Sequence, residues 1–279
     1  MSSTYGQALL GAQSSGLDRL DAQLLLLHAL GKIDTERAWL LAHDDDALDI
    51  TQATTYQALV SRRAAGEPLA YLVGYKEFFG LRLAVDARVL IPRPDTETLV
   101  HWALDTLRAA GSSSPAVLDL GTGSGALAVA IADAISCSMT AVDASEGALA
   151  VASGNAGQLG VNVAFVQSDW FSRVEGRFNC IVSNPPYIAA DDLHLAALRH
   201  EPLSALSAGS DGLSDIRTIA KGAPMHLHPN GWLLVEHGYD QASAVRDLLI
   251  QHGFKRVQSR VDLAGISRCT GGQWLAETS

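Results

Sequence analysis

The chain has 279 residues, of which 48% are hydrophobic and 18% charged, a balance that is typical of a folded globular protein and shows no sign of disorder. The formal net charge of −10 counts against a surface built to hold nucleic acid, which needs clustered Lys and Arg side chains. The three cysteines are odd in number and far apart, which excludes a disulfide framework and a CxxC metal pair.

Residues 1 to about 66 carry apolar side chains at helical spacing. The predicted helices are residues 17–30, 34–42 and 51–65. The four consecutive leucines of residues 24–27 are expected to lie in a hydrophobic core. We therefore predict a small helical bundle, residues 1–70, as a separate domain without a catalytic residue of its own.

The pattern changes over residues 71–91. Leu81, Leu83 and Val85 alternate with polar or small residues, and Gly80 supplies the chemistry of a turn. This alternation predicts a β-hairpin that links the helical domain to the rest of the chain.

Residues 92–279 alternate between helix and strand patterns and form the third predicted segment. The predicted strands are residues 116–120, 139–142, 161–166, 180–183 and 232–236, with two final β segments near 256–261 and 274–276. The predicted helices are residues 95–109, 124–134, 145–159, 211–226 and 241–252. Strands separated by helix-length segments imply an α/β fold with a doubly wound, Rossmann-like, mostly parallel sheet, which binds ligands at the carboxyl ends of its strands.

A glycine-rich loop joins the first strand of this sheet to its helix. Its residues are Gly121, Thr122, Gly123, Ser124 and Gly125. Glycines let the backbone approach a ligand closely and adopt positive φ. With Ala126 the loop also fits the relaxed dinucleotide pattern G-x-G-x-x-A, so nicotinamide and flavin cofactors remain alternatives. The next strand ends in Asp143, which could accept both hydroxyls of a ribose in either class of cofactor.

Two further strand ends narrow the choice of cofactor. Asp169 and Trp170 follow the third strand and offer an acid for an adenine amino group and a ring for stacking. The fourth strand ends in the turn Asn184-Pro185-Pro186-Tyr187, which presents an amide, a free carbonyl and an aromatic ring. This set suits a planar NH2 group and has no use in a dehydrogenase. The combination predicts S-adenosylmethionine as cofactor and S-adenosylhomocysteine as product.

The predicted site therefore has two parts. The predicted cofactor-binding residues are Gly121, Thr122, Gly123, Ser124, Gly125, Asp143, Asp169, Trp170 and Asn184, and the predicted catalytic residues are Asn184, Pro185, Pro186 and Tyr187. No metal site is predicted, because His226 and His228 lie beside a proline without a third ligand.

Motifs over essentially the whole chain resemble one known family. Residues 119–125, 168–171 and 182–188 look like those of class I methyltransferases that act on amino groups. Five further stretches restrict the resemblance to one branch of these enzymes, and they are residues 66–68, 91–97, 201–203, 234–238 and 262–268. Together with the helical N-terminal domain, these stretches resemble the peptide-chain release factor glutamine N5-methyltransferases.

The resemblance implies transfer of a methyl group to the side-chain nitrogen of the glutamine in the Gly-Gly-Gln motif of class I release factors, which modulates translation termination. Because a carboxamide nitrogen is a poor nucleophile and no positioned base is evident, we expect alignment to be the main catalytic device. Asn184 and the Pro185 carbonyl would each accept one hydrogen of the substrate NH2, while Tyr187 packs against its plane. Arg93 and Glu97 are expected either at the pocket mouth or in a salt bridge between domains.

Expectations for partners and location complete the prediction. A three-residue motif offers little area for specificity, so residues 1–70 are expected to recognise the release factor. We expect a cytoplasmic protein without membrane contact, because no basic leader with an apolar core and no apolar run of about 18 residues is present. We also expect a monomer that does not bind nucleic acid directly. This chain's own Gly271-Gly272-Gln273 is interpreted as a glycine turn before the last strand, not as a methylation site.

Three alternatives remain open. An adenine N6-methyltransferase acting on DNA or RNA would meet an exocyclic amine with the same two hydrogens, but the acidic charge and the absence of a basic insert count against it. A non-catalytic adaptor that binds the cofactor would not need the intact turn at residues 184–187. A nucleotide-dependent oxidoreductase is the third alternative.

Overall fold

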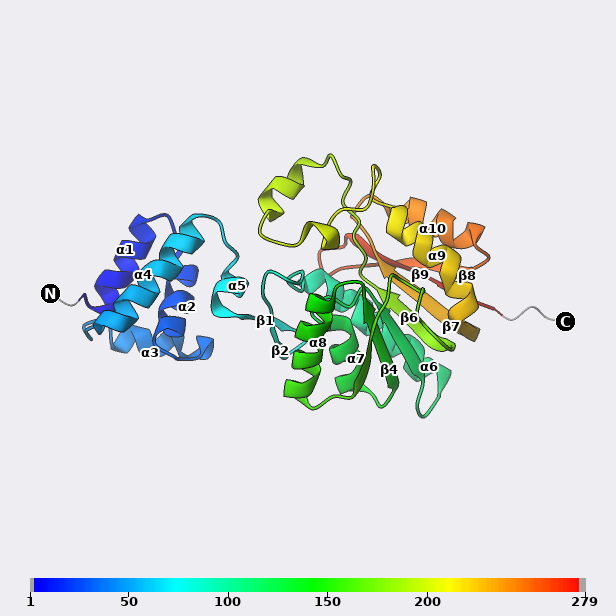
Figure 1. Ribbon diagram of the computed structural model, residues 1–279, viewed down its shortest axis with the longest axis horizontal. Coiled ribbons are helices and arrows are strands. Elements are labelled where there is room, and N and C mark those ends of the chain that lie inside the picture. Colours follow the sequence, from blue (N-terminus) through cyan, green and yellow to red (C-terminus); the bar gives the residue numbers. More distant parts are fainter. Residues whose placement is uncertain (1–2, 276–279) are drawn as a thin grey trace. The chain divides into compact units, whose positions relative to one another are not determined.

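The computed structural model describes residues 3–275 and divides into two compact units, with the boundary after Tyr75 (Figure 1). The first unit is helical, and the second contains a mixed sheet covered by helices. The predicted α/β fold with a helical N-terminal part is confirmed. Among the described residues, no helix is long and apolar enough to cross a membrane.

The first unit is built from short helices with strong caps. Its elements are α1 (Tyr5–Ser14), α2 (Arg19–Ala29), η1 (Asp34–Glu36), α3 (Arg37–Ala42), α4 (Ile50–Ala64) and α5 (Leu69–Val73). Asp49 begins α4, because its carboxylate accepts the backbone N–H of Gln52 at 2.8 Å. Leu25, Leu26 and Leu27 are fully buried in the core of this unit, as predicted, whereas Leu24, the fourth leucine of the predicted stripe, is only half-buried, so the prediction was wrong for it.

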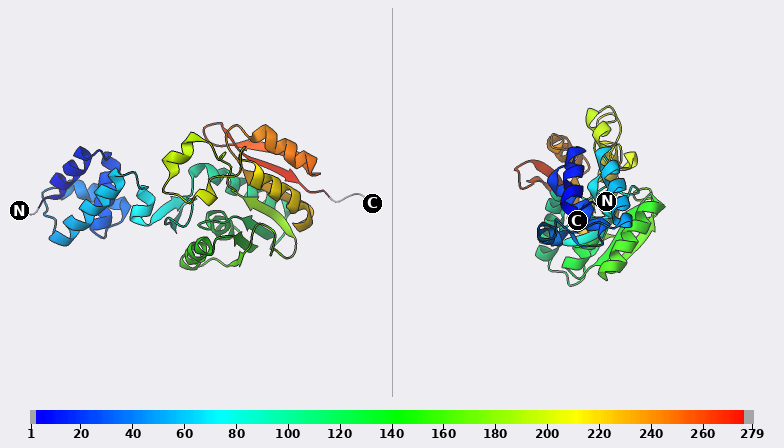
Figure 2. Two further views of the ribbon diagram at one scale, coloured as in Figure 1. Left: turned by 45° about the horizontal axis from the view of Figure 1, so that its top comes forward. Right: turned by 90° about the vertical axis from the view of Figure 1, so that its left-hand side faces the viewer.

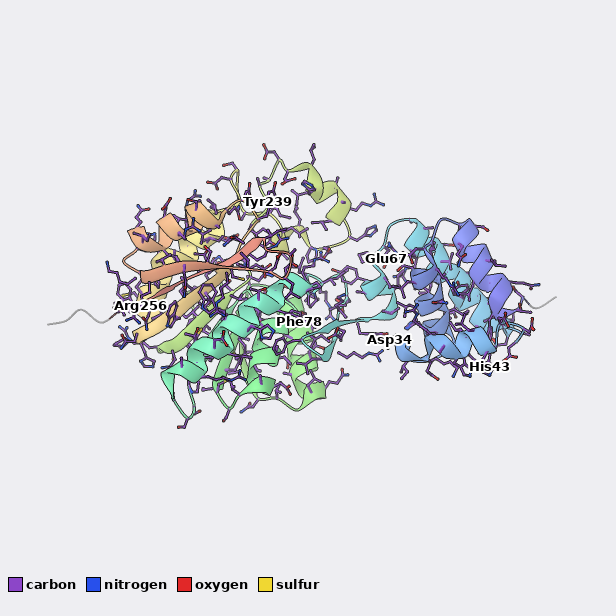
Figure 3. All side chains as sticks on the ribbon, turned by 180° about the vertical axis from the view of Figure 1, so that it is seen from behind. Asp34, His43, Glu67, Phe78, Tyr239 and Arg256 are labelled. Carbon is purple, nitrogen blue, oxygen red and sulfur yellow. The ribbon has the colours of Figure 1, made fainter. Side chains whose placement is uncertain are left out.

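Two helices of this unit were not expected from the sequence, α1 and α5. Helix α1 carries a capping box, in which the Thr4 hydroxyl accepts from Gln7 N at 3.3 Å and Gln7 Oε1 accepts from Thr4 N at 3.1 Å. This local signal was readable in the sequence. Close to this start of α1, where Gly6 N donates to the Asp44 carbonyl at 2.8 Å, the His43 ring, labelled in Figure 3, stacks on Trp39 with a centroid distance of 4.0 Å.

The predicted hairpin is present as β1 (Tyr75–Phe78) and β2 (Leu81–Ala84). Phe79 and Gly80 join the strands, and both have positive φ, 54° and 76°. Positive φ at both central residues is the feature of the two-residue turns that match strand twist. Phe78, labelled in Figure 3, is 1% exposed and anchors the hairpin in the core of the second unit.

The sheet of the second unit has the strand order β5-β4-β3-β6-β7-β9-β8. Its strands are β3 (Ala116–Leu120), β4 (Ser138–Asp143), β5 (Val163–Gln167), β6 (Phe178–Ser183), β7 (Leu227–Glu236), β8 (Lys255–Val261) and β9 (Ser267–Gln273). The strands from β3 to β7 pair in parallel, and β9 pairs antiparallel with both β7 and β8. The order reverses direction beside β3, which places a ligand crevice at the carboxyl ends of β3 and β6.

Helices cover both faces of this sheet (Figures 1 and 2). They are α6 (Glu97–Ala110), α7 (Ala126–Ala134), α8 (Glu146–Leu159), α9 (Ser214–His226) and α10 (Ala242–Gln251), with short 3-10 turns η2 (Pro94–Thr96), η3 (Leu193–Leu198) and η4 (Leu203–Ala205). Alternate strand residues face opposite sides, so Val182 packs with α6 and α7 while Ile181 packs with α9 and α10. The helices thereby hold the strand ends that carry the site.

The prediction for the last strand was wrong. Gly271 and Gly272 do not form a turn before a strand at residues 274–276, because they lie inside β9, and Ala276 is outside the described residues. A Cβ on Gly271 would lie 2.4 Å from Leu234 Cδ2, and one on Gly272 would lie 2.8 Å from Phe254 Cβ. These glycines are therefore required by close packing and not by a turn.

Gln273 is correspondingly inaccessible. Its Nε2 donates to the carbonyl of Asn230 at 2.9 Å, and its Oε1 accepts from Arg256 Nη1 at 3.1 Å. The side chain is held at the edge of the core with 9% of its surface exposed. This geometry leaves no free amide for self-methylation.

Candidate active site

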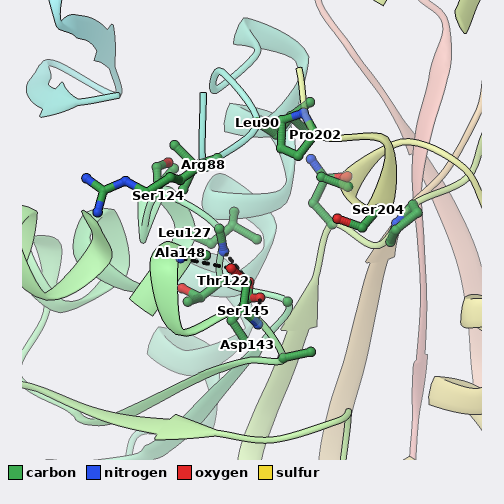
Figure 4. Close-up of a pocket in the computed structure, with 18 of the residues that line it drawn as sticks. Arg88, Leu90, Thr122, Ser124, Leu127, Asp143, Ser145, Ala148, Pro202 and Ser204 are labelled. Atoms are coloured by element: carbon green, nitrogen blue, oxygen red, sulfur yellow. Dashed lines mark hydrogen bonds between the residues drawn. The ribbon is translucent and has the colours of Figure 1, made fainter. Parts of the chain in front are cut away.

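A cavity of about 530 Å³ opens at the carboxyl ends of the parallel strands (Figure 4). The predicted residues that line it are Gly121, Thr122, Gly123, Ser124, Asp143, Asp169, Trp170, Asn184 and Pro186. Figure 4 shows Thr122, Asp143 and Ser145 grouped at one side, and Pro202 and Ser204 approaching from another segment. The strand ends singled out in the sequence therefore do meet at one crevice.

The glycine loop has an open part and a closed part. Gly121, Gly123 and Gly125 have φ values of 70°, 55° and 82°. A Cβ on Gly123 would meet no other described atom within 4 Å, so the loop backbone faces free space there. A Cβ on Gly125 would lie 3.1 Å from Ala152 Cβ, so this glycine lets α7 pack closely on α8. Gly125 is accordingly not among the described residues that line the cavity.

Asp143 ends β4 and is fixed by backbone donors. Its Oδ2 accepts from Gly123 N at 2.9 Å, and its Oδ1 accepts from Ser145 N at 2.9 Å. Each carboxylate oxygen can accept a second hydrogen bond. The aligned carboxylate can therefore still bind two neighbouring hydroxyls of a ligand.

Trp170 lies over the glycine loop. Its φ of 46° is rare for a bulky residue and is the kind of backbone strain found at functional sites. Its ring lies 3.4 Å from the position that a Cβ on Gly121 would take. The Trp170 side chain also hydrogen-bonds Asp215, whose pKa is raised by burial and by the charge of Asp169, and lowered by this bond. Asp215 lines the cavity and was missed in the sequence, where it reads only as an acid near a helix start.

The turn after β6 brings only part of its residues to the cavity. Asn184 and Pro186 line it, whereas Pro185 and Tyr187 are not among its lining residues in the described structure. Asn184 Nδ2 donates to Thr96 Oγ1 at 3.3 Å. Asn184 Oδ1 is buried and finds no hydrogen-bond partner within residues 3–275. A buried acceptor without a partner is costly, so this oxygen is set to receive a donor from a bound molecule.

Hydrogen bonds to Glu236 and Gln241 hold Tyr187 in place. Its hydroxyl donates to Glu236 Oε1 at 3.3 Å, and its carbonyl accepts from Gln241 Nε2 at 3.0 Å. Burial, followed by the adjacent Glu236 carboxylate, raises the pKa of the phenol above its usual value. Tyr187 is therefore neutral and serves as a rigid hydrogen-bond donor and apolar surface.

Two buried carboxyls that sequence reasoning missed lie beneath the site. Burial raises the pKa of Asp119, at 0% exposure in β3, to about 7, although the Thr122 hydroxyl and Ala128 N–H favour its charged form. Burial also raises the pKa of Glu236, at the end of β7, to about 7, while the hydroxyls of Thr96 and Tyr187 lower it. Their positions at strand ends were a readable signal, but their burial was not.

Arg93 and Glu97 do not line the cavity in the described residues. Arg93 forms an ion pair with the buried Glu201, which also accepts from Ile91 N at 3.1 Å. Glu97 accepts from Phe79 N at 3.0 Å. These contacts lie within the second unit and fasten segment 91–97 and the loop before η4 around the site, so the prediction of a bridge between domains was wrong for both residues.

Comparison with known proteins agrees with the architecture of both units. The chain matches the PrmC N-terminal domain family over residues 3–74 and the methyltransferase small domain family over residues 98–201. Among solved structures, a methyltransferase from Pyrococcus furiosus is 19% identical with a TM-score of 0.54, covering 80% of this chain and 100% of that one. This last likeness concerns the fold alone.

Curated relatives match over nearly the full length. A release factor glutamine methyltransferase of Bordetella pertussis is 51% identical over 264 residues, covering 92% of this chain and 95% of the relative. A protein of the same name from Burkholderia pseudomallei is 50% identical and covers 94% of each chain. These relatives support the resemblance found in the sequence and not the adenine-modifying alternative. The chain is a methyltransferase and belongs to the release factor glutamine methyltransferase family.

Proposed function

We propose that the enzyme transfers a methyl group from S-adenosylmethionine to the side-chain amide nitrogen of the glutamine in the Gly-Gly-Gln motif of class I release factors, and thereby modulates translation termination. The observation that carries this proposal is the buried Asn184 Oδ1, an acceptor without a partner at a cavity whose other wall is a glycine loop. A primary amide supplies the donor that this oxygen lacks. The names of the curated relatives support the same substrate.

The residues present fit S-adenosylmethionine. The cavity, at about 530 Å³, is of the size that holds small molecules. Open backbone at Gly123, the carboxylate of Asp143 and the ring of Trp170 suit an amino acid tail, a ribose and an adenine. When bound, this cofactor supplies a methyl group activated by an adjacent sulfonium. S-adenosylhomocysteine is then the second product.

The protein's own contribution is alignment. The lone pair of an amide nitrogen is delocalised, so the nitrogen must be held in line with the methyl group. Asn184 Oδ1 accepts one N–H group of the substrate, and the Pro185 carbonyl, although it is not among the described lining residues, is assigned the other. Both acceptors bind more tightly as the nitrogen gains positive charge, and the methylated nitrogen then loses one proton to water. His237 does not act as the base, because its Nδ1 bonds the Gly238 carbonyl at 2.8 Å, its Nε2 bonds the Thr270 hydroxyl at 2.8 Å, and the fully buried ring is not among the described residues that line the cavity.

The remaining parts of the proposal concern the other unit and the cell. Residues 1–70 recognise the release factor away from its glutamine, residues 71–91 link this domain to the catalytic one, and residues 92–279 carry the chemistry. The enzyme acts as a monomer in the cytoplasm without direct contact to nucleic acid.

Transfer of a labelled methyl group from S-adenosylmethionine to a purified class I release factor tests the function. We expect label on the normal factor and none on the same factor with its Gly-Gly-Gln glutamine changed to alanine. Label on added nucleic acid instead, sensitive to ribonuclease or deoxyribonuclease and resistant to protease, would contradict the proposal.

A further inference from the structure

A chain of hydrogen bonds runs from the acceptor turn into the core. Asn184 Nδ2 donates to Thr96 Oγ1 at 3.3 Å, and Thr96 is 3% exposed. The Thr96 hydroxyl also lies near enough to Glu236 to favour its charged form and lower its pKa, against the larger effect of burial, which raises it. Glu236 is 1% exposed, and its Oε2 lacks a partner of ordinary hydrogen-bond geometry among residues 3–275. A buried carboxylate thus lies next to the hydroxyl that holds the amide proposed to meet the substrate.

The contact with Thr96 bears on which end of the Asn184 carboxamide, the oxygen or the NH2 group, faces the cavity. The oxygen and nitrogen ends of a carboxamide have nearly the same shape, so packing alone does not decide which end faces the cavity. Only the oxygen can accept a hydrogen from a substrate NH2. With the NH2 end turned to the cavity, two donors would meet, and alignment of the substrate would be lost.

We propose that Glu236, acting through the Thr96 hydroxyl, fixes the Asn184 carboxamide with its oxygen toward the substrate. An ionised carboxylate can only accept, so the single hydrogen of the Thr96 hydroxyl points to Glu236. Thr96 Oγ1 is then left as an acceptor and binds the NH2 end of Asn184. Glu236 and Thr96 are positioning residues, and the inference rests on the proposed function.

Protonation of Glu236 would remove this control over the orientation of Asn184. A protonated carboxyl can donate to Thr96 Oγ1, which frees the hydroxyl hydrogen for Asn184 Oδ1 and permits the opposite orientation. Since burial raises the pKa of Glu236 to about 7, the active, ionised form is the one present above neutrality. Turnover should therefore fall as the pH is lowered through about 7.

The other charged and titratable groups that face Glu236 come from three directions. Asp95 precedes Thr96 in η2 and raises the pKa of Glu236, whereas Arg268 in β9 lowers it. Arg268 is shared between Asp95 and Asp262, at 3.0 Å from each. The Tyr187 phenol donates from the turn after β6, and the Cys269 thiol faces Glu236 from β9 with its own pKa raised. None of these groups replaces Thr96 as a described link to Asn184.

Thr96→Val tests the link, since it keeps the shape of the side chain and removes the hydroxyl. We expect kcat for methyl transfer to fall about ten-fold, the effect of one net hydrogen bond, while the Kd for S-adenosylmethionine stays near that of the wild type. Thr96→Ser restores the hydroxyl and should recover most of the lost turnover. Thr106→Val is the matched control, because the Thr106 hydroxyl, further along α6, donates to the Trp102 carbonyl and to no side chain of the site.

The pH profile separates positioning from a structural role. The wild type and Thr96→Ser should lose kcat on the acid side of about pH 7, and Glu236→Gln and Thr96→Val should show a lower kcat without that limb. A limb that persists in Glu236→Gln belongs to Asp119, the other buried carboxyl with a pKa of about 7, and overturns the role of Glu236. Should Glu236→Gln fail to fold, the Thr96 pair decides alone, and equal kcat for valine and serine overturns the inference.

Failure of this inference is distinguishable from failure of the proposed function. If the wild type transfers no methyl group to the release factor, the function is wrong. If the wild type is active and Thr96→Val matches it in kcat and in pH profile, the function stands and only the orienting role of Thr96 and Glu236 is wrong.

Discussion

The glycine loop after β3 and the glycine pair in β9 use the same residue for opposite reasons. At Gly123 the position of a missing Cβ is open space beside the cavity, with a φ of 55°. At Gly271 the same position is filled by Leu234 and by Trp102, whose ring carbon Cη2 lies 2.9 Å from it. A glycine in one region makes room for a ligand, and in the other it makes room for the core. Substitutions at the two sites should therefore affect different properties.

The largest effect is expected for Gly123→Val. A β-branched residue is strained at positive φ and would fill the free space at the loop. We expect binding of S-adenosylmethionine to be lost in isothermal titration calorimetry, while the far-ultraviolet circular dichroism spectrum keeps its native shape. Cofactor binding at wild-type affinity would show that the loop does not approach the cofactor.

A smaller effect of a different kind is expected for Gly271→Ala. The added methyl group overpacks the core between Leu234 and Trp102, which costs roughly 1–3 kcal/mol of the free energy of unfolding. Urea denaturation measures this loss, and the cofactor Kd of the folded variant should be unchanged. A weakened Kd with unchanged stability would mean that β9, not only the loop, determines the shape of the site.

A pH-dependent effect concerns the carboxyl beneath the loop. Asp119 has a folded-state pKa of about 7 against an ordinary 3.8, so it binds its proton more tightly when folded. Its contribution to stability is present below pH 3.8 and is lost as the pH rises through about 7. Asp119→Asn should reduce the decline in the free energy of unfolding over this range, as measured by urea titrations at several pH values. Parallel curves for variant and wild type would contradict the raised pKa.

The regions also differ in how far the sequence predicts them. Strand β6 and the turn at residues 184–187 follow from local chemistry, because a β-branched run must stop at two prolines. The loop at 121–125 is likewise a local pattern. The role of Gly271 depends on Trp102 in α6, which is distant in the chain. Gly271 and Gly272 were therefore mistaken for a turn.

The same limit applies to the site. Sequence patterns place Asp143, Trp170 and Asn184 at strand ends that the structure brings to one cavity. They do not reveal that Glu236 is buried against Thr96 and Tyr187, since burial and the resulting pKa arise from tertiary packing. Local signals thus identify the residues that meet ligands, and long-range contacts identify those that hold them in place.

The central claim is that Asn184, although it lines the cofactor cavity, contributes far more to aligning the substrate amide than to holding the cofactor. The most direct measurement is kcat for methyl transfer by Asn184→Ala beside its Kd for S-adenosylmethionine, with saturating release factor. The account predicts a loss in kcat of about 100- to 1,000-fold, as for removal of one transition-state hydrogen-bonding group, and a Kd close to that of the wild type. A variant that turns over normally, or that loses cofactor binding in proportion to kcat, would contradict it.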